Sequence, residues 1–290
     1  MRIKEIFKHK PQVLSMEVFP PKRNGALDQL FHVVSDLKAL SPDYISVTYG
    51  AGGSTRNLTK EIALNIKKNA GIESMAHLTC VGNTKNELKE ILEDLKNSGI
   101  DNILALRGDP PQGQNKFEAV EGGFQYANEL IEFIRNEEDY FSIGVAGYPE
   151  KHPEAKNYEE DILNLKRKVD AGADFIVTQL FFNNDDFYRF MDKVRSIGID
   201  IPVIPGIFLI SSYKQIHRLA ELCGATIPKD LENKLYQFKD NNEEIKKIGI
   251  DFALQQSENI LNRQIAQGLH YYIMNRKDMI EKIVQTIKMK

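Results

Sequence analysis

The sequence predicts an α/β protein and, within that class, a single (β/α)8 TIM barrel domain over residues 1–290. Eight short stretches rich in β-branched and aromatic residues have the length and composition of strands. The first seven alternate with segments of helical period, and parallel strands need such crossovers. Polar or charged residues stand at or just past the ends of these stretches, which is where barrel enzymes keep their chemistry.

The predicted strands follow one another with room for a helix in each crossover. They are 13–19, 44–49, 75–81, 102–107, 142–147, 174–181, 202–208 and 270–275. The longest interval, between the seventh and eighth strands, contains three helical patterns at 213–223, 229–238 and 243–267. We therefore expect extra helices between strands seven and eight, and a last helix at 276–288 that completes the ring.

Composition excludes several classes of protein. With 42% apolar residues, 27% charged residues and a net charge of −3, the chain resembles an ordinary globular protein and lacks the basic surface that nucleic acids attract. No apolar run approaches the ~20 residues that span a bilayer, and the first residues have no signal-peptide pattern. Cys80 and Cys223 lack the spacing of a metal site. We expect a cytoplasmic protein with no metal, no nucleic-acid partner and no membrane partner.

Two carboxylates stand at predicted strand ends. Glu17 lies inside an otherwise apolar strand, where desolvation would raise its pKa and let it donate a proton near neutral pH. A structural glutamate bonded to backbone or to a basic side chain is an equal alternative. Asp109 follows strand four in the segment 107–111, RGDPP, and would point into the barrel mouth. A plain Asp-Pro turn is the alternative there.

The helix predicted at 157–171 carries a polar stripe. Asp161, Asn164 and Lys168 stand at i, i+3 and i+7, and Arg167 adjoins them. Such a stripe suits a ligand with ribose and diphosphate groups, because a guanidinium binds phosphate oxygens bidentately. From spacing alone, an ordinary solvated face is the more frequent explanation.

Several motifs of the chain together resemble the methylenetetrahydrofolate reductase family, in its bacterial form and over the catalytic barrel. They are MEVFPPK, SVTYGAGGSTR, HLTCVG, ILALRGDPP, AGYPEKHPEA, DILNLKRKVDAGADFIVTQLFF, IPGI and HYYIMNR, in the family's order across nearly the whole chain. The resemblance implies a flavoprotein of one-carbon metabolism and methionine biosynthesis with FAD at the strand ends. It also implies ping-pong reduction of 5,10-methylenetetrahydrofolate to 5-methyltetrahydrofolate, with NADH or NADPH as electron donor.

The resemblance also assigns roles to individual residues. Glu17 matches the general acid, which would protonate N10 of the folate, and Asp109 would stabilise the cation that follows. The matches to flavin contacts are Tyr49, Ala51, His77, Arg107, Gly108, Asp109, Ala127, Tyr148, His152, Ala155, Asp161, Asn164, Arg167 and Lys168. The matches to folate or nicotinamide contacts are Thr48, Asp109, Gln179, Gln215 and Arg276.

Two other interpretations stay open at this point. A different flavin barrel, such as a proline or amine dehydrogenase, has the same fold, and fold alone does not fix the substrate. A barrel subunit that receives electrons from a partner protein is the second. Because bacterial family members form homo-oligomers, the resemblance also implies self-association.

Overall fold

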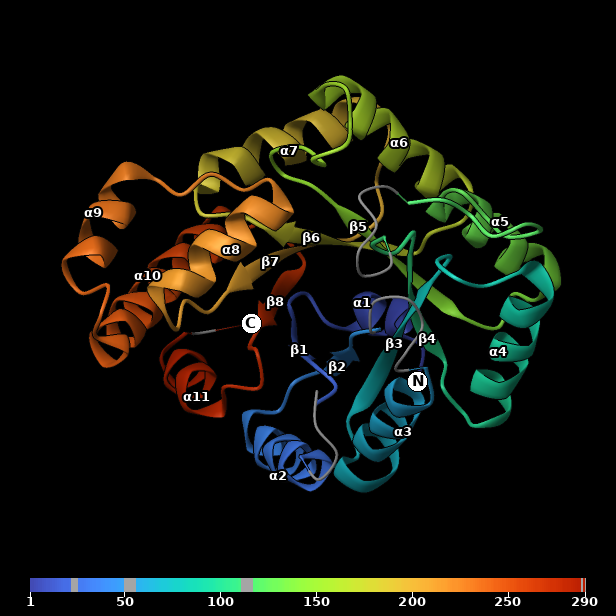
Figure 1. Ribbon diagram of the computed structural model, residues 1–290, viewed down its shortest axis with the longest axis horizontal. Helices are drawn as coiled ribbons and strands as arrows, with labels where there is room; N and C mark the ends of the chain where they lie inside the picture. Colours follow the sequence, from blue (N-terminus) through green and yellow to red (C-terminus); the bar gives the residue numbers. More distant parts are fainter. Residues whose placement is uncertain (22–25, 50–55, 111–116, 288, 290) are drawn as a thin grey trace.

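The computed structural model describes residues 1–290 except 22–25, 50–55, 111–116, 288 and 290. Its eight strands pair in parallel, each with the next along the chain, and β8 pairs with β1 to close the barrel. Helices surround this ring of strands (Figure 1). The predicted (β/α)8 barrel is therefore confirmed.

The elements follow the predicted order. The strands are β1 (Val13–Val18), β2 (Tyr44–Val47), β3 (Glu73–Thr79), β4 (Asn102–Leu106), β5 (Ser142–Gly147), β6 (Phe175–Leu180), β7 (Val203–Phe208) and β8 (Gly268–Tyr272). The helices are α1 (Ile3–His9), α2 (Leu27–Leu37), α3 (Arg56–Asn65), α4 (Lys85–Asn97), α5 (Ala127–Glu137), α6 (Tyr158–Asp170), α7 (Asn184–Ser196), α8 (Tyr213–Cys223), α9 (Lys229–Gln237), α10 (Asn242–Arg263) and α11 (Lys277–Thr286). Two short helical turns, η1 (Lys38–Leu40) and η3 (Ile66–Ala70), complete the series. Helices α8, α9 and α10 are the extra helices expected between the last two strands.

Strand β8 begins and ends earlier than the predicted 270–275. Met274 and Asn275 have φ angles of 48° and 59°, which take the backbone out of the extended region, so the strand cannot continue through them. The apolar residues that follow the strand belong to a turn, although their composition is that of a strand. The difference matters because this turn lies at the end of the barrel where the polar residues gather.

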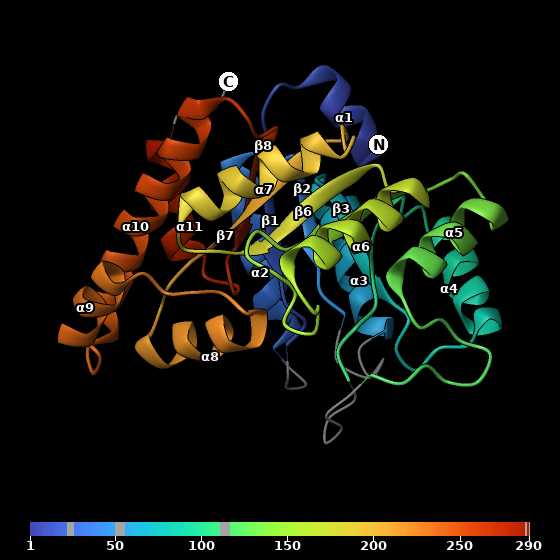
Figure 2. The same ribbon diagram turned by 90° about the horizontal axis from the view of Figure 1, so that it is seen from above.

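Helix α1, which we did not predict from the sequence, covers the opposite end of the barrel. Its side chains Ile3 and Ile6 are buried in a cluster with residues of the barrel interior. Its first free N–H groups are satisfied by the strands, since Ile3 donates to Oδ1 of Asn102 at 2.7 Å and Lys4 donates to Oγ of Ser142 at 3.0 Å. Figure 2 shows α1 at one end of the barrel and α8 at the other.

Alternation along the strands decides which side chains enter the barrel. The outward residues of β1 and β8 pack in the core beneath the helices and are Leu14, Met16, Val18, Leu269 and Tyr271. The alternate residues Ser15, Glu17, His270 and Tyr272 therefore point inward. Val13, one step nearer α1, belongs to the apolar cluster on that floor. The interior thus changes from apolar near α1 to polar toward the strands' C-terminal ends.

Candidate active site

Glu17 lies at the polar end of the barrel interior and is 5% exposed. Its Oε2 atom lies 3.3 Å from Nε2 of His77 on β3 and 3.6 Å from Nε2 of His270 on β8. Ser46 on β2 donates its hydroxyl to the same oxygen at 3.3 Å. Strand register explains part of this convergence, because Glu17 pairs with Ser46 on one side and with Tyr272, next but one to His270, on the other. Three strands thus place polar groups around one carboxyl that belongs to a fourth.

The expectation that Glu17 is protonated because its strand end is dry is wrong for this structure. Burial by itself would raise the pKa of Glu17, but the charge of His77 and the close approach of both imidazoles, His270 and His77, to the carboxyl outweigh it and lower the pKa to about 2. The apolar neighbours in the sequence point outward, whereas the neighbours in space are imidazoles and a hydroxyl. A proton that Glu17 donates must therefore belong to the whole cluster and not to an isolated carboxyl.

Arg107, Gly108 and Asp109 form the loop after β4, as the sequence predicts. Arg107 makes a bidentate ion pair with Glu154, with N–O distances of 2.6 and 2.8 Å. Gly108 has a φ of 91°, and a Cβ there would lie 2.8 Å from Cγ1 of Val81, so the loop needs glycine at this position. Asp109 follows as an exposed carboxylate.

Glu17 and Asp109 lie at the same end of the barrel. Burial, followed by the charges of Asp109 and Glu17, raises the pKa of the Cys223 thiol, at the end of α8, to about 12. Both carboxylates are therefore within electrostatic range of this partly buried thiol. Burial and, to a smaller extent, the charge of Asp109 raise the pKa of Tyr148. The loop after β5 therefore lies in the same region.

The polar stripe of α6 is partly buried, so the alternative of an ordinary solvated face is wrong for two of its members. Asp161 is 9% exposed, and its Oδ2 accepts a hydrogen bond from the backbone N–H of His152 at 3.0 Å. Lys168 donates its amine to the carbonyl of Ala146 on β5, and burial lowers its pKa to about 8, with Asp161 opposing the shift. Asn164 accepts a hydrogen bond from the exposed Arg167. Across the ranges that the structure describes, no ion pair joins Lys168 to a carboxylate.

The loop between β5 and α6 is held by its own contacts. The rings of Tyr148 and His152 meet edge to face with centroids 4.7 Å apart. His152 accepts the N–H of Glu154 at Nδ1 and the N–H of Ala155 at its carbonyl, at 3.1 and 3.0 Å. Burial, followed by the charge of Arg107, lowers the pKa of His152. A neutral imidazole here can accept or donate a hydrogen bond to a ligand.

The other residues that the resemblance assigns have less defined surroundings. Thr48 and Tyr49 directly follow β2, Gln179 lies in β6, Ala127 begins α5, Gln215 lies in the first turn of α8 and Arg276 caps α11. Gln179 is occupied by the N–H of Leu180 at 2.8 Å, and Gln215 by the hydroxyl of Ser211. Ala51 lies outside the described residues. Their binding roles stay predictions.

Four residues of this region were not anticipated from the sequence. Ser15, Ser46 and His270 belong to the Glu17 cluster, and alternation along β1, β2 and β8 was the available signal for them. Asn275 joins the ends of β8 and β1, since its side chain accepts the N–H of Phe19 at 2.9 Å and donates to the carbonyl of Phe19 at 3.0 Å. This pair of bonds fixes the chain two residues beyond Glu17.

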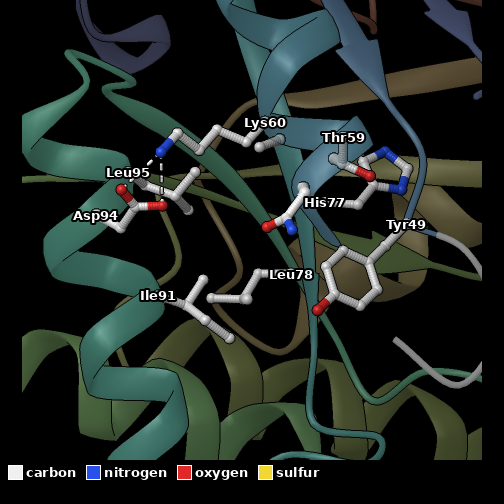
Figure 3. Close-up of a pocket in the computed structure, with 10 residues that line it drawn as sticks. Tyr49, Thr59, Lys60, His77, Leu78, Ile91, Asp94 and Leu95 are labelled. Atoms are coloured by element: carbon white, nitrogen blue, oxygen red, sulfur yellow. Dashed lines mark hydrogen bonds and ion pairs between the residues drawn. The ribbon is translucent and has the colours of Figure 1, made fainter. Parts of the chain in front are cut away.

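A separate cavity lies beside β3, α3 and α4. Figure 3 shows the Lys60–Asp94 ion pair at one side of it and Tyr49, Thr59 and His77 at the other. Its volume of about 10 Å³ holds roughly one water molecule. It is a packing gap and is too small for a folate or a nucleotide.

Comparison with known proteins identifies the family. The model of the methylenetetrahydrofolate reductase family matches residues 2–288. This chain belongs to the methylenetetrahydrofolate reductase family.

Relatives within the methylenetetrahydrofolate reductase family differ in length. Methylenetetrahydrofolate reductase (NADH) 1 of Arabidopsis thaliana is 43% identical over 284 residues, which cover 94% of this chain and 48% of the plant protein. The 5,10-methylenetetrahydrofolate reductase of Escherichia coli is 39% identical over 274 residues, covering 94% of this chain and 90% of the bacterial protein. The chain thus spans about half the length of the plant relatives and most of the bacterial one.

Solved structures confirm the fold of this family member. A protein from Clostridium thermocellum that binds two copies of 5-methyl-5,6,7,8-tetrahydrofolic acid superposes with a TM-score of 0.66 at 14% identity, covering 98% of this chain and 97% of the other. Oxaloacetate acetylhydrolase superposes with a TM-score of 0.54 at 11% identity, covering 98% and 83%. At such identities the likeness concerns the barrel alone.

Two further classes of site are absent from the described part of the chain. No helix there is long and apolar enough to cross a membrane. No group of three or more histidine, cysteine, aspartate or glutamate side chains there could hold a metal ion.

Proposed function

We propose that this member of the methylenetetrahydrofolate reductase family reduces 5,10-methylenetetrahydrofolate to 5-methyltetrahydrofolate, with FAD as cofactor and NADH or NADPH as electron donor. The observation that carries the proposal is the buried carboxyl of Glu17 at the strand ends, in contact with two imidazoles. Opening the folate's five-membered ring requires a proton on N10, and a carboxyl that shares a cluster's proton can supply it. The names of the relatives support the same reaction.

The donor groups near β4, β5 and α6 fit the diphosphate and ribose of FAD. Lys168 donates a hydrogen bond to the carbonyl of Ala146, so a phosphate would give this cation an anionic partner, which stabilises a charge partly removed from water. Arg167 carries a further guanidinium, and Arg107 would contact a phosphate in exchange for its ion pair with Glu154. The close packing at Gly108 lets backbone approach a ligand without a side chain between them.

The side chains divide the reaction between them. FAD, when bound, would supply the hydride transfer that no protein side chain performs. Glu17 would donate a proton to N10, so that the bond from N10 to the methylene carbon breaks and its electron pair stays on N10. Asp109 would stabilise the positive charge that develops on N5 and the methylene carbon, because its carboxylate lies at the same end of the barrel. The buried surroundings of Glu17 would keep water away from that cation.

The direct test is an anaerobic titration of the purified protein, reconstituted with FAD, in which the visible flavin absorption is followed. We expect NADH or NADPH to bleach the absorption and methylenetetrahydrofolate to restore it, while proline added to the oxidised protein changes nothing. Bleaching by proline would favour the amine dehydrogenase alternative. If neither nucleotide bleaches the flavin but the folate reoxidises dithionite-reduced protein, the donor is a partner protein. Failure of the folate to reoxidise the reduced protein would contradict the proposal.

A further inference from the structure

His270 is buried in the barrel beneath Glu17 with both ring nitrogens directed at polar groups. It is 1% exposed. Its Nδ1 lies 2.8 Å from Oγ of Ser15, and its Nε2 lies 3.6 Å from Oε2 of Glu17. Neither the family resemblance nor the names of the relatives assign this residue a role.

The hydroxyl of Ser15 determines where the hydrogen atoms of His270 lie. A hydroxyl has one hydrogen, and when Ser15 donates it to the carbonyl of Leu269 at 3.3 Å, an atom that can only accept, Ser15 has none left to donate to His270. The contact between Oγ of Ser15 and Nδ1 of His270 must then use a hydrogen on Nδ1. In a neutral ring this tautomer leaves Nε2 without a hydrogen.

If Nε2 of His270 has no hydrogen and Glu17 is ionised, a lone pair on the nitrogen faces a lone pair on the carboxylate oxygen. The two repel each other, and in a buried place no water can separate them. The conflict disappears when one proton lies between them, carried either by Nε2 of His270 or by Oε2 of Glu17. We propose that His270 is a positioning residue for Glu17: oriented by Ser15, it holds the carboxyl at the strand end through a proton that the two groups share.

The shared proton gives Glu17 a way to act as an acid although it is not an isolated protonated carboxyl. The shared proton moves fully onto the carboxyl of Glu17, which gives it to N10 of the folate, and the N10–methylene bond breaks with its electron pair on nitrogen. The cluster then holds one proton fewer and regains it from solvent. This agrees with the one proton that reduction by a nicotinamide nucleotide consumes. The acid role rests on the proposed function, whereas the shared proton does not.

Other groups also face this pair and will influence its titration. The groups around Glu17 and His270 from the neighbouring elements are His77 on β3, the hydroxyls of Tyr44 on β2 and Tyr272 on β8, and the Cys223 thiol at the end of α8. The hydroxyls and the thiol are neutral near pH 7, because burial raises each of their pKa values. His77 is the other imidazole among these groups, and its Nε2 lies 3.3 Å from Oε2 of Glu17.

The first test needs neither substrate nor cofactor. Protein labelled with ¹⁵N in its six histidines is examined by NMR as a function of pH, and the His270 signals are assigned by their absence in His270→Gln. We expect Nδ1 of His270 to stay protonated at every pH where the protein is folded. We also expect Nε2 to lose its proton at lower pH in Glu17→Gln than in the native protein. A neutral His270 with its hydrogen on Nε2, or identical titrations in both proteins, would overturn the proposal.

The second test measures the half-reactions in the FAD-loaded protein. His270→Gln keeps an amide donor near Nε2 but cannot pass on a proton, so we expect the folate step to slow by roughly tenfold or more and to lose its dependence on the cluster's ionisation. Reduction by NADH should change by no more than about twofold. Combined with Glu17→Gln, the histidine substitution should add nothing, because His270 acts through Glu17.

The control is Tyr271→Phe, the next residue of β8. Its hydroxyl bonds Oγ of Ser257 at 2.8 Å on the outer side of the strand, so this variant should lose stability and keep the native pH profile. If His270→Gln does not fold, Ser15→Ala replaces it, with the same expected change of profile. A native pH profile in either cluster variant, or losses that multiply with Glu17→Gln, would contradict the proposal. A native protein whose folate step is absent would instead contradict the proposed function.

Discussion

Glu17 is surrounded by apolar residues in the sequence and by imidazoles in space. The sequence places Met16 and Val18 beside it, and from them one expects a dry site with a raised pKa. Both of these neighbours point outward, and the groups that do reach Glu17 come from residues 29, 60 and 253 positions away in the chain. Their arrival depends on strand register and barrel closure, neither of which composition encodes. The carboxyl was therefore identifiable from the sequence, but its protonation was not.

Lys168 differs from Glu17 because its surroundings could be anticipated. The i, i+3, i+7 stripe placed it beside Asp161, and the structure has Asp161 buried and Lys168 partly buried, with its amine on the carbonyl of Ala146. Spacing could not reveal the depth of that burial, which is what lowers the pKa of Lys168 to about 8.

The lowered pKa of Lys168 predicts how FAD binding depends on pH. Below pH 8 the amine is charged and can bind a diphosphate; above it the free protein must take up a proton to bind. We expect the affinity for FAD to be constant below about pH 8 and to fall about tenfold per pH unit above it. Quenching of FAD fluorescence by the apoprotein between pH 7 and 10 measures this directly.

Two substitutions on α6 distinguish a specific contribution of Lys168 to FAD binding from the general effect of removing one positive charge. Lys168→Met should bind FAD weakly at every pH and abolish the slope. Lys166→Met removes an equal charge that pairs with Asp170 on the other side of the helix, and it should keep the native affinity and slope. An affinity of the native protein that does not change with pH would refute the role of Lys168.

Strands and helices were predictable where hydrophobic period and turn residues agree. Strand β5 and helix α8 begin and end where the sequence predicts, and the ends of most other elements differ by one to three residues. Helix α1 was missed because its seven residues form too short a pattern and its stability comes from packing on the barrel floor. The predicted range of strand β8 lies too far along the chain, because the composition of this apolar run does not indicate the positive φ angles of Met274 and Asn275.

The loop after β4 supplies a prediction at this scale. Gly108→Ala should lower the free energy of unfolding by more than Gly99→Ala, because both backbones have positive φ but only the Cβ at 108 would overlap a neighbour, Val81. The strain alone costs about 1–2 kcal/mol, which is the loss expected for Gly99→Ala. Urea denaturation of the two variants gives the comparison. Equal losses would show that the loop moves away from Val81 without cost.

The whole molecule depends on closure of the barrel between its first and last strands. The pair β1–β8 brings His270 and Glu17 together, and the Asn275–Phe19 bonds fasten its C-terminal end. At the other end Gly268 lies against β1, where a Cβ would stand 2.0 Å from the carbonyl oxygen of Val13. The pairing that closes the barrel therefore also assembles the site.

Substitution at Gly268 should therefore affect the entire fold. We expect Gly268→Ala to lower stability by more than about 4 kcal/mol or to prevent folding, because strand β8 can accept the methyl group only by separating from β1. Circular dichroism and a thermal melt, compared with Gly99→Ala, will show this. A melting temperature near that of Gly99→Ala would mean that the strands separate at little cost.

The most direct measurement of the central claim is a stopped-flow comparison of the two half-reactions in the native protein and in Glu17→Gln. If Glu17 supplies the proton for the folate, its loss should slow flavin reoxidation by methylenetetrahydrofolate by roughly 10²–10⁴-fold and leave flavin reduction by NADH or NADPH within about twofold. The uncharged amide fills the same volume, so the fold should persist. Equal losses in both half-reactions, or an unchanged folate step, would contradict the assignment of Glu17 as the acid.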